Sequence, residues 1–283
     1  MPLALILSSY VAASRVGGVA QAMALAPFKI DPVLVPTVVY GRHPGWGAPG
    51  GADVGANAFR GVIEGVVAQG MLGLADVLIT GYFASAEQVW IAAETIDRAR
   101  AADRTGAYGP KLTVIVDPIM GDEGSGLYVP EDVAEAIALD LVPRADILTP
   151  NAWELARLTS LEADTSRAMA ETARTLGRPV LVTSVPVSKT EIGVLYVDRR
   201  TSTLAAHARL KAVPNGMGDV VCALFAAGLI DGLAPWEALF RAVQGVAEVA
   251  QAAAEWKAPE LPLAAVAERL VRPKAAVRIE TLS

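Results

Sequence analysis

The sequence predicts an α/β fold, a three-layer sandwich in which a mainly parallel central sheet has helices on both faces. Short apolar runs alternate with longer segments of helical spacing along the 283 residues, at the spacing of β-α-β units. The apolar runs are continuous, which is typical of strands buried on both faces of a parallel sheet. Neither a long linker nor an internal repeat divides the sequence, so a single domain over residues 1–283 is expected.

The first half of the chain provides strands and helices in alternation. Val, Ile and Leu runs predict strands at residues 3–7, 32–39 (broken by Pro36), 76–80, 112–116 and 146–149. Helical spacing predicts helices at residues 16–26, 58–69, 84–101 and 131–139, with Asn57 as an N-cap of the second. Residues 41–55 are rich in Gly and Pro and are expected to form a loop.

The second half continues the same alternation. Strands are expected at residues 179–183, 193–197 and 203–208, the last two at an edge of the sheet. Helices are expected at residues 153–159, 166–176, 218–230, 235–254 and 263–270.

Composition excludes several classes of function. Lys and Arg number 24 against 30 Asp and Glu, and this net charge of −6 disfavours a nucleic-acid binder. A single cysteine, Cys222, excludes a disulfide framework, and the two histidines, His43 and His207, are far apart in sequence. Every long apolar stretch is interrupted by charges, Gly or Pro, so no membrane span is expected. The N-terminus lacks a cationic leader, and a cytoplasmic protein is expected.

Polar residues follow the predicted strands. They are Ser8 and Ser9, Thr37, Thr80 to Tyr82, Asp117, Thr149 to Asn151, and Thr183 with Ser184. Open parallel sheets bind ligands at the carboxyl ends of their strands. This pattern favours a site for a polar small molecule, although strand ends are often polar for structural reasons.

The sharpest motif is NGMGD, residues 215–219, which directly precedes an apolar helix. A glycine turn that opens a helix leaves backbone N–H groups free, and the helix dipole adds positive charge, so the turn suits a phosphate. Asp219 would repel a phosphate unless it accepts a proton from a hydroxyl that attacks the phosphorus. The alternative is an ordinary turn in which Asp219 is a first-turn acid.

GMGD before an alanine-rich helix resembles the GTGD element of ribokinase-like small-molecule kinases. Further segments narrow the resemblance to pyridoxal kinases, and together they cover residues 3–270. These segments are ILSSYVAASRVGGVAQ, PTVVYGRHPGWG, ITGYFASAEQ, DPIMGDEGSGLYVP (residues 117–130) and TPNAWE (residues 149–154).

The resemblance implies an enzyme that transfers the γ-phosphoryl group of ATP to the 5′-hydroxymethyl group of pyridoxal, with pyridoxine and pyridoxamine as further candidates. It implies Asp219 as the base and the backbone of Gly216, Met217 and Gly218 as an anion hole. By the same resemblance, the pyridine ring would meet Ser9, Thr37, Val38 and Tyr82. The nucleotide would meet Asp117, Thr149, Asn151, Glu154, Thr183, Ser184 and Arg209.

The same resemblance implies cofactors and assembly. Asp117, Asn151 and Glu154 would organise Mg²⁺ and water near the phosphates, a task that suits hard oxygen ligands. Asp122 would approach the phosphates or a monovalent cation such as K⁺. The relatives are homodimers, so a homodimer with pyridoxal as its small-molecule partner is expected.

Several of these residues are also of types that serve ordinary local structure. Asn151 and Glu154 fit a capping-box pattern, Asp117 precedes a proline that can end a strand, and Ser9 and Thr37 are common turn formers. His43, in the Gly/Pro loop, is expected to face solvent.

The chain also departs from the family pattern. Met217 stands between the two glycines, Tyr10 replaces a histidine, Gly18 stands where many relatives have asparagine, and the connection 209–215 is short. Met217, Tyr10 and the short connection leave open a kinase-like binding protein that has lost turnover. A related hydroxymethylpyrimidine kinase of thiamin synthesis is the other alternative, because it also phosphorylates a hydroxymethyl group on a heteroaromatic ring. The segment after the first strand is not a GxGxxG turn, which disfavours a Rossmann dehydrogenase.

Overall fold

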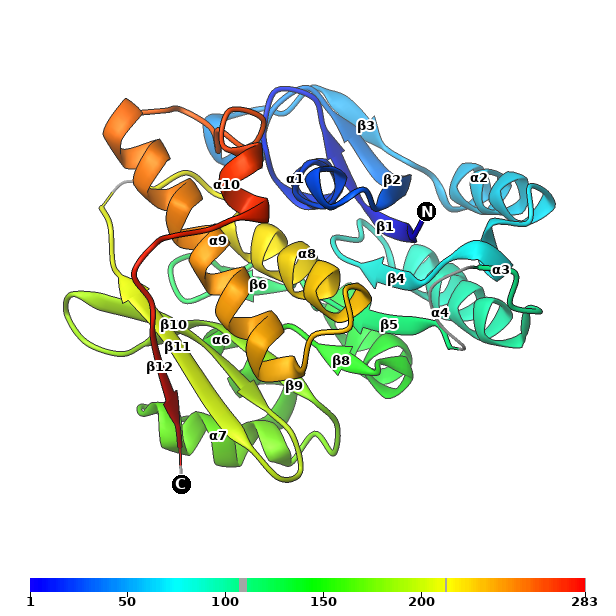
Figure 1. Cartoon of the computed structure of the whole chain (residues 1–283). Coiled ribbons are helices and arrows are strands. Elements are labelled where there is room, and N and C mark those ends of the chain that lie inside the picture. Colours follow the sequence, from blue (N-terminus) through cyan, green and yellow to red (C-terminus); the bar gives the residue numbers. More distant parts are fainter. Residues whose placement is uncertain (107–110, 212, 283) are drawn as a thin grey trace.

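The computed structural model describes residues 1–106, 111–211 and 213–282. Ten strands form one sheet in the order β12-β11-β10-β9-β8-β5-β4-β1-β2-β3 (Figure 1). The six strands from β9 to β2 are parallel to one another, and the outer strands are antiparallel. The strands are β1 (Leu3–Val11), β2 (Asp31–Tyr40), β3 (Gly51–Asp53), β4 (Val77–Thr80), β5 (Thr113–Val116), β8 (Ile147–Leu148), β9 (Val180–Pro186), β10 (Glu191–Val197), β11 (Ser202–Ala208) and β12 (Arg278–Thr281). A separate hairpin pairs β6 (Gly121–Asp122) with β7 (Gly126–Leu127).

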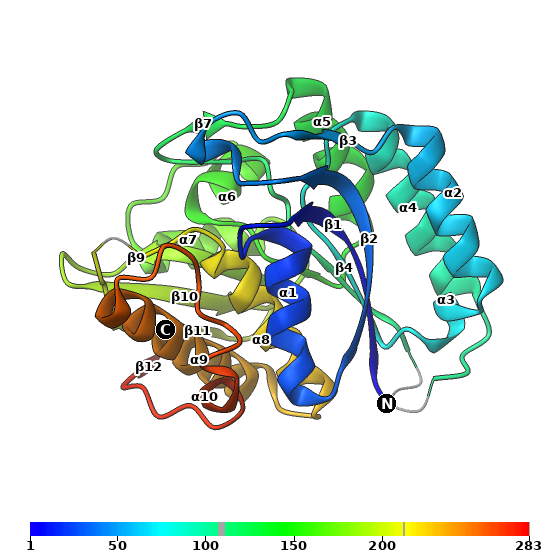
Figure 2. The same ribbon diagram turned by 90° about the horizontal axis from the view of Figure 1, so that it is seen from above.

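Helices cover both faces of the sheet (Figure 2). One face carries α1 (Gly17–Leu25), α8 (Met217–Ile230), α9 (Pro235–Trp256) and α10 (Ala267–Val271). The other carries α2 (Ala56–Ala68), α3 (Met71–Leu74), α4 (Ala86–Ala101), α5 (Glu131–Ala136), α6 (Ala152–Thr159) and α7 (Ser166–Arg174). The predicted three-layer sandwich is confirmed.

The alternation of side chains in β1 explains why both faces need cover. Leu3, Leu5 and Leu7 pack into the hydrophobic core under α2 to α7, whereas Ala4 and Ile6 pack under α1 and α8. Successive residues of a strand point to opposite faces, so a continuous apolar run has no face that tolerates water. None of the helices in the described ranges is long and apolar enough to cross a membrane.

Pro36 does not break its strand, contrary to the sequence prediction. β2 runs unbroken from residue 31 to residue 40 and pairs with β1 on one side. On its other side, β3 pairs only with Val38, Val39 and Tyr40. Pro36 therefore lies where β2 is the edge of the sheet, and a missing N–H costs little there.

Other boundaries also differ from the predictions. β1 continues through its polar residues to Val11, and the Gly/Pro loop contains a short 3-10 helix (Pro44–Trp46) and β3. Gly55, not Asn57, is the N-cap of α2. α5 is shorter than predicted and continues as a π-helical turn (Ile137–Leu141). β12, which the sequence does not predict, lies outside β11 at the edge of the sheet.

Candidate functional site

A cavity of about 630 Å³ opens at the carboxyl ends of the parallel strands, beside the N-terminus of α8. Strand register brings these ends together, because Thr80 pairs with Leu7 on one side and with Val116 on the other, and Val116 pairs with Leu148. The lining residues that the sequence predicts for the site are Ser9, Val38, Tyr82, Asp117, Thr149, Asn151, Glu154, Thr183, Ser184, Gly216, Met217, Gly218 and Asp219.

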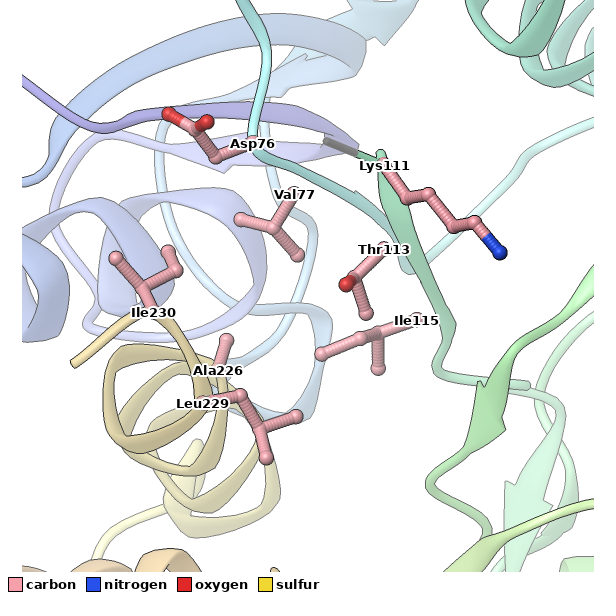
Figure 3. Close-up of a pocket in the computed structure, with 8 residues that line it drawn as sticks. All are labelled: Asp76, Val77, Lys111, Thr113, Ile115, Ala226, Leu229 and Ile230. Atoms are coloured by element: carbon pink, nitrogen blue, oxygen red, sulfur yellow. The ribbon is translucent and has the colours of Figure 1, made fainter. Parts of the chain in front are cut away.

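A second, much smaller hollow lies at the amino ends of β4 and β5 (Figure 3). Its volume is about 120 Å³, and apolar side chains of α8, such as Leu229 and Ile230, form one wall. The carboxylate of Asp76 at its rim accepts a hydrogen bond from the backbone N–H of Leu3 (2.9 Å) and pairs with Arg104 (3.2 Å). This hollow is a gap between packed elements, and we place the candidate site in the larger cavity.

Two predicted residues lie outside the lining of the cavity. Thr37 is fully buried, and its hydroxyl donates to the carbonyl oxygen of Tyr82 (2.7 Å). The hydroxyl of Ser8 accepts from the backbone N–H of Tyr82 (3.4 Å), so both residues fix the backbone of Tyr82. Arg209 is exposed just beyond β11, where its N–H donates to the carbonyl of Thr190 (2.8 Å). The short connection 209–215 contains residue 212, which is outside the described residues.

Irregular pairing places several of the lining residues. The β1–β2 register shifts between Ser8 and Tyr10, so Ser9 lies opposite the two residues Thr37 and Val38. The β9–β10 register shifts where β9 carries Thr183 and Ser184, and Ser184 has a left-handed backbone (φ 57°). Bulges re-aim side chains and are frequent beside active sites. Neither bulge is visible in the hydrophobic pattern, because each lies in the polar end of its strand.

The glycine turn at the start of α8 is shaped by contacts that exclude side chains. Gly216 is the N-cap with a left-handed backbone (φ 100°), and a Cβ there would lie 2.2 Å from the carbonyl oxygen of Arg15. A Cβ on Gly218 would meet nothing within 4 Å, although Gly218 lines the cavity. The turn is therefore closely packed behind Gly216 and open in front of Gly218. The first-turn N–H groups of a helix lack carbonyl partners in the helix and suit an anion in that open space.

Asp219 presents two carboxylate oxygens with different surroundings. Its Oδ2 accepts a hydrogen bond from the backbone N–H of Gly17 (2.8 Å), whereas its buried Oδ1 has no partner in the described structure. Burial raises the pKa of Asp219 to about 6, and the Gly17 N–H opposes that rise. At neutral pH the group is an ionised carboxylate with one oxygen free to accept a proton.

Two further buried carboxylates, those of Asp117 and Glu154, line the same cavity as Asp219. Burial raises the pKa of Asp117 well above its usual value, and the negative charges of Asp219 and Glu154 raise it further. Burial also raises the pKa of Glu154 to about 7, against hydrogen bonds from the backbone of Asn151, Met120 and Gly121. Three carboxylates share a desolvated region, and a cation placed among them would lower their repulsion.

Asn151 and Glu154 form the capping box that their spacing permits. Asn151 Oδ1 accepts from the N–H of Glu154 (2.9 Å), and Glu154 Oε2 accepts from the N–H of Asn151 (2.9 Å). Glu154 Oε1 also accepts from Met120 (2.9 Å), and Asn151 Nδ2 donates to the carbonyl of Gly121 (2.8 Å). Within the described residues, no three His, Cys, Asp or Glu side chains are placed to hold a metal ion among themselves.

The sequence alone assigns no role to some residues of the site. The backbone N–H of Gly17 donates to the carboxylate of Asp219. A Cβ added to Gly17 would lie 1.9 Å from Ser9 Oγ. Tyr128 lines the cavity, and burial together with Glu154 raises its pKa. His43 is half-buried in the lining rather than directed only to solvent, which corrects its predicted place. Gly17 and Asp219 are 202 residues apart, so no local motif could link them.

Comparisons with known proteins agree with this geometry. The family described as phosphomethylpyrimidine kinase matches residues 75–263. A pyridoxine/pyridoxal/pyridoxamine kinase of Bordetella avium is 35% identical over 231 residues, which cover 79% of this chain and 76% of the relative. Pyridoxal kinase PdxY of Leifsonia xyli is 31% identical over 275 residues, 95% of each chain.

Solved structures show the same fold. Pyridoxal kinase of Leishmania donovani in complex with ADP and pyridoxamine superposes over 100% of both chains, with a TM-score of 0.90 at 24% identity. Sequence relatives and fold agree with each other and with the motifs. The chain therefore belongs to the pyridoxal kinases of the ribokinase-like superfamily.

Proposed function

We propose that the protein is an ATP-dependent pyridoxal kinase that phosphorylates the 5′-hydroxymethyl group of pyridoxal, with pyridoxine and pyridoxamine as further candidates. One observation carries the proposal: the buried carboxylate of Asp219 has a free oxygen in a cavity at the glycine turn of α8. The relatives that share its sequence are kinases of this vitamin group. Because the cavity takes residues from both β1 and α8, we also propose that residues 1–283 act as one domain.

The proposed reaction uses Asp219 as the general base. Its Oδ1 takes the proton of the substrate hydroxyl, and the hydroxyl oxygen forms a bond to the γ-phosphorus of ATP. The bond from that phosphorus to the β,γ-bridging oxygen breaks, and ADP leaves with the electron pair. The hydrogen bond from Gly17 to Oδ2 orients the carboxylate for this transfer.

The glycine turn would hold the transferring phosphoryl group. Backbone N–H groups of Gly216, Met217 and Gly218 point from the first turn of α8, where the helix dipole favours negative charge. The open space at Gly218 leaves room for phosphate oxygens. Met217 contributes its backbone, so its side chain in place of a smaller one is compatible with this role.

The pyridine ring would lie at the opposite side of the cavity. Ser9 and Val38 line this region at the β1–β2 bulge, and Tyr82 packs beside it. Thr37 would act through its hydrogen bond to the carbonyl oxygen of Tyr82, which fixes the backbone of that residue.

The nucleotide and Mg²⁺ would lie toward β5, β8 and β9. Thr149, Thr183 and Ser184 line this part of the cavity, whereas Arg209 is not among the lining residues and is a weaker candidate. Asp117 would be the direct protein ligand of Mg²⁺, because its buried carboxylate lines the cavity. Asn151 and Glu154, engaged in their capping box, would act through water. Bound Mg²⁺ neutralises phosphate charge and keeps several water ligands.

A monovalent cation such as K⁺ near Asp122, a homodimer and a cytoplasmic location belong to the same proposal.

The test of the proposal measures ADP release from MgATP with pyridoxal. The wild type should turn over, and Asp219→Asn should lower kcat by about 10²–10⁴-fold with little change in KM, because only proton transfer is lost. Asp231→Asn is the matched control, since Asp231 lies at the other end of α8 in an ion pair with Arg241 (2.7 Å). Wild-type turnover in Asp219→Asn would overturn the mechanism.

A second candidate is phosphorylation of a hydroxymethylpyrimidine, which the description of the matching family favours. Both substrates carry a hydroxymethyl group on a heteroaromatic ring, so the same base would serve either. Competition between pyridoxal and the pyrimidine in one assay separates them through the ratio of kcat/KM. Calorimetric binding of pyridoxal, without ADP release from MgATP in the presence of either acceptor, would indicate a binding protein.

A further inference from the structure

The segment between β1 and α1 is held by a residue from the other end of the chain. Glu260 follows α9, and its Oε1 accepts a hydrogen bond from the hydroxyl of Ser14 (3.0 Å). Its Oε2 accepts from the backbone N–H of Arg15 (2.9 Å). One carboxylate thus fixes two consecutive residues of this segment.

The segment that Glu260 holds contacts the candidate catalytic groups directly. The carbonyl oxygen of Arg15 packs behind Gly216, and the N–H of Gly17 donates to Asp219 Oδ2 (2.8 Å). Leu261, the neighbour of Glu260, lies 3.2 Å from the position of a Cβ on Gly216. Both Asp219 and the glycine turn are therefore in direct contact with residues 15–17.

The same segment contacts the loop that lines the cavity on the β2 side. The hydroxyl of Ser14 accepts a hydrogen bond from the backbone N–H of His43 (3.3 Å) while it donates to Glu260. His43 lines the cavity together with its neighbours Pro44 and Gly45. Ser14 thereby joins Glu260 to this wall of the cavity.

We propose that Glu260 is a positioning residue for phosphoryl transfer: it fixes residues 14 and 15 so that the Gly17 N–H holds Asp219 in its catalytic orientation. This inference rests on the proposed function. A carboxylate is needed because two donors converge on it, one at each oxygen. A glutamine accepts at only one of these positions and turns its NH₂ group toward the other donor.

The test compares Glu260→Gln with Glu248→Gln. Glu248 is a matched control, because its Oε1 also accepts a backbone N–H from a distant segment, that of Lys274 (2.8 Å), and it is not part of the cavity lining. We expect Glu260→Gln to lower kcat about tenfold while the KM values for ATP and pyridoxal change less than about twofold. Glu248→Gln should keep the wild-type kcat. Ser14→Ala, which removes one of the two hydrogen bonds, should lower kcat by less and serves as the test if Glu260→Gln fails to fold.

A double-mutant cycle separates positioning from general support of the fold. If Glu260 acts through the base, Glu260→Gln should not lower the residual turnover of Asp219→Asn any further. An equal fall in both backgrounds, or a wild-type kcat in Glu260→Gln and in Ser14→Ala, overturns the inference. A wild type that releases no ADP with pyridoxal overturns the proposed function as well, so the two failures are distinguishable.

Discussion

At the scale of single residues, the site depends on the unequal surroundings of the two oxygens of Asp219. One is held by Gly17, and the other is buried without a partner among the described residues. A general base works best when its pKa lies slightly below the working pH, where it is ionised and still accepts a proton readily. Burial provides that pKa here, and hydrogen bonds from the backbone N–H groups of Gly17 and of Asp219 itself keep it from rising further.

This arrangement predicts the acid side of the pH profile. The pKa of Asp219 is about 6, so the base is lost as pH falls through that value. We expect kcat/KM for pyridoxal to be about tenfold lower at pH 5 than at pH 8, because kcat/KM follows the groups of the free enzyme and about a tenth of a group with this pKa is ionised at pH 5. The measurement is ADP release across this range, with samples returned to pH 8 to verify that the loss is reversible. A kcat/KM that stays flat down to pH 5 would exclude Asp219 as the titrating base.

At the scale of elements, substitutions in the first turn of α8 should affect the stability of the protein and its activity differently. Gly218→Ala should keep or raise the unfolding temperature, because alanine favours a helix over glycine by up to about 1 kcal/mol and its Cβ meets nothing within 4 Å. It should still lower kcat/KM for ATP at least tenfold, because the methyl group occupies the space proposed for phosphate oxygens. Steady-state kinetics and thermal unfolding on the same sample test both parts.

Gly216→Ala is the matched variant two residues earlier. Its backbone is left-handed, and its Cβ would overlap the carbonyl oxygen of Arg15, so this variant should lose about 1–3 kcal/mol of unfolding free energy. Wild-type kinetics in Gly218→Ala would show that no phosphate lies against this turn.

Local signals explain which elements the sequence predicts well. The capping box of Asn151 and Glu154 spans four residues, and the glycine turn spans five, so both are visible in the sequence. β12 is not visible, because it is short and exposed and forms only by pairing with β11, some 75 residues earlier. The polar end of β1 is hidden for a similar reason: Ser8 and Ser9 interrupt the apolar run, and only their pairing with β2 continues the strand.

At the scale of the whole molecule, the site joins the two ends of the chain. Asp219 on α8 meets Gly17 at the start of α1, and Glu260 meets Ser14 and Arg15. The sequence predicts that Asp219 and Ser9 share a site through the order of strands and the resemblance to a family. It does not predict which backbone groups support Asp219, because those contacts depend on how α1 and the segment after α9 pack against α8.

The buried carboxylates should make the catalytic arrangement costly for the stability of the whole protein. The pKa of Asp219 is raised from 3.8 to about 6, so folding opposes its ionisation, and this difference corresponds to a loss of about 3 kcal/mol of unfolding free energy above pH 6. Asparagine removes the charge and can still accept the Gly17 hydrogen bond. Asp219→Asn should therefore unfold about 5 °C above the wild type at pH 8.

The pH dependence of this gain identifies its cause. Below the unfolded-state pKa of 3.8 the wild-type carboxyl is protonated in both states, so the advantage of Asp219→Asn should be constant between pH 8 and about pH 7 and should shrink as the pH falls from about 6 to 4.5. Asp231→Asn should show no such gain, because its half-exposed carboxylate is paired with Arg241. Thermal unfolding of the three proteins at both pH values decides the matter. A gain in unfolding temperature that is the same at both pH values would have to come from packing. A gain confined to high pH would mean that the wild-type protein is less stable because it keeps an ionised base in a desolvated cavity.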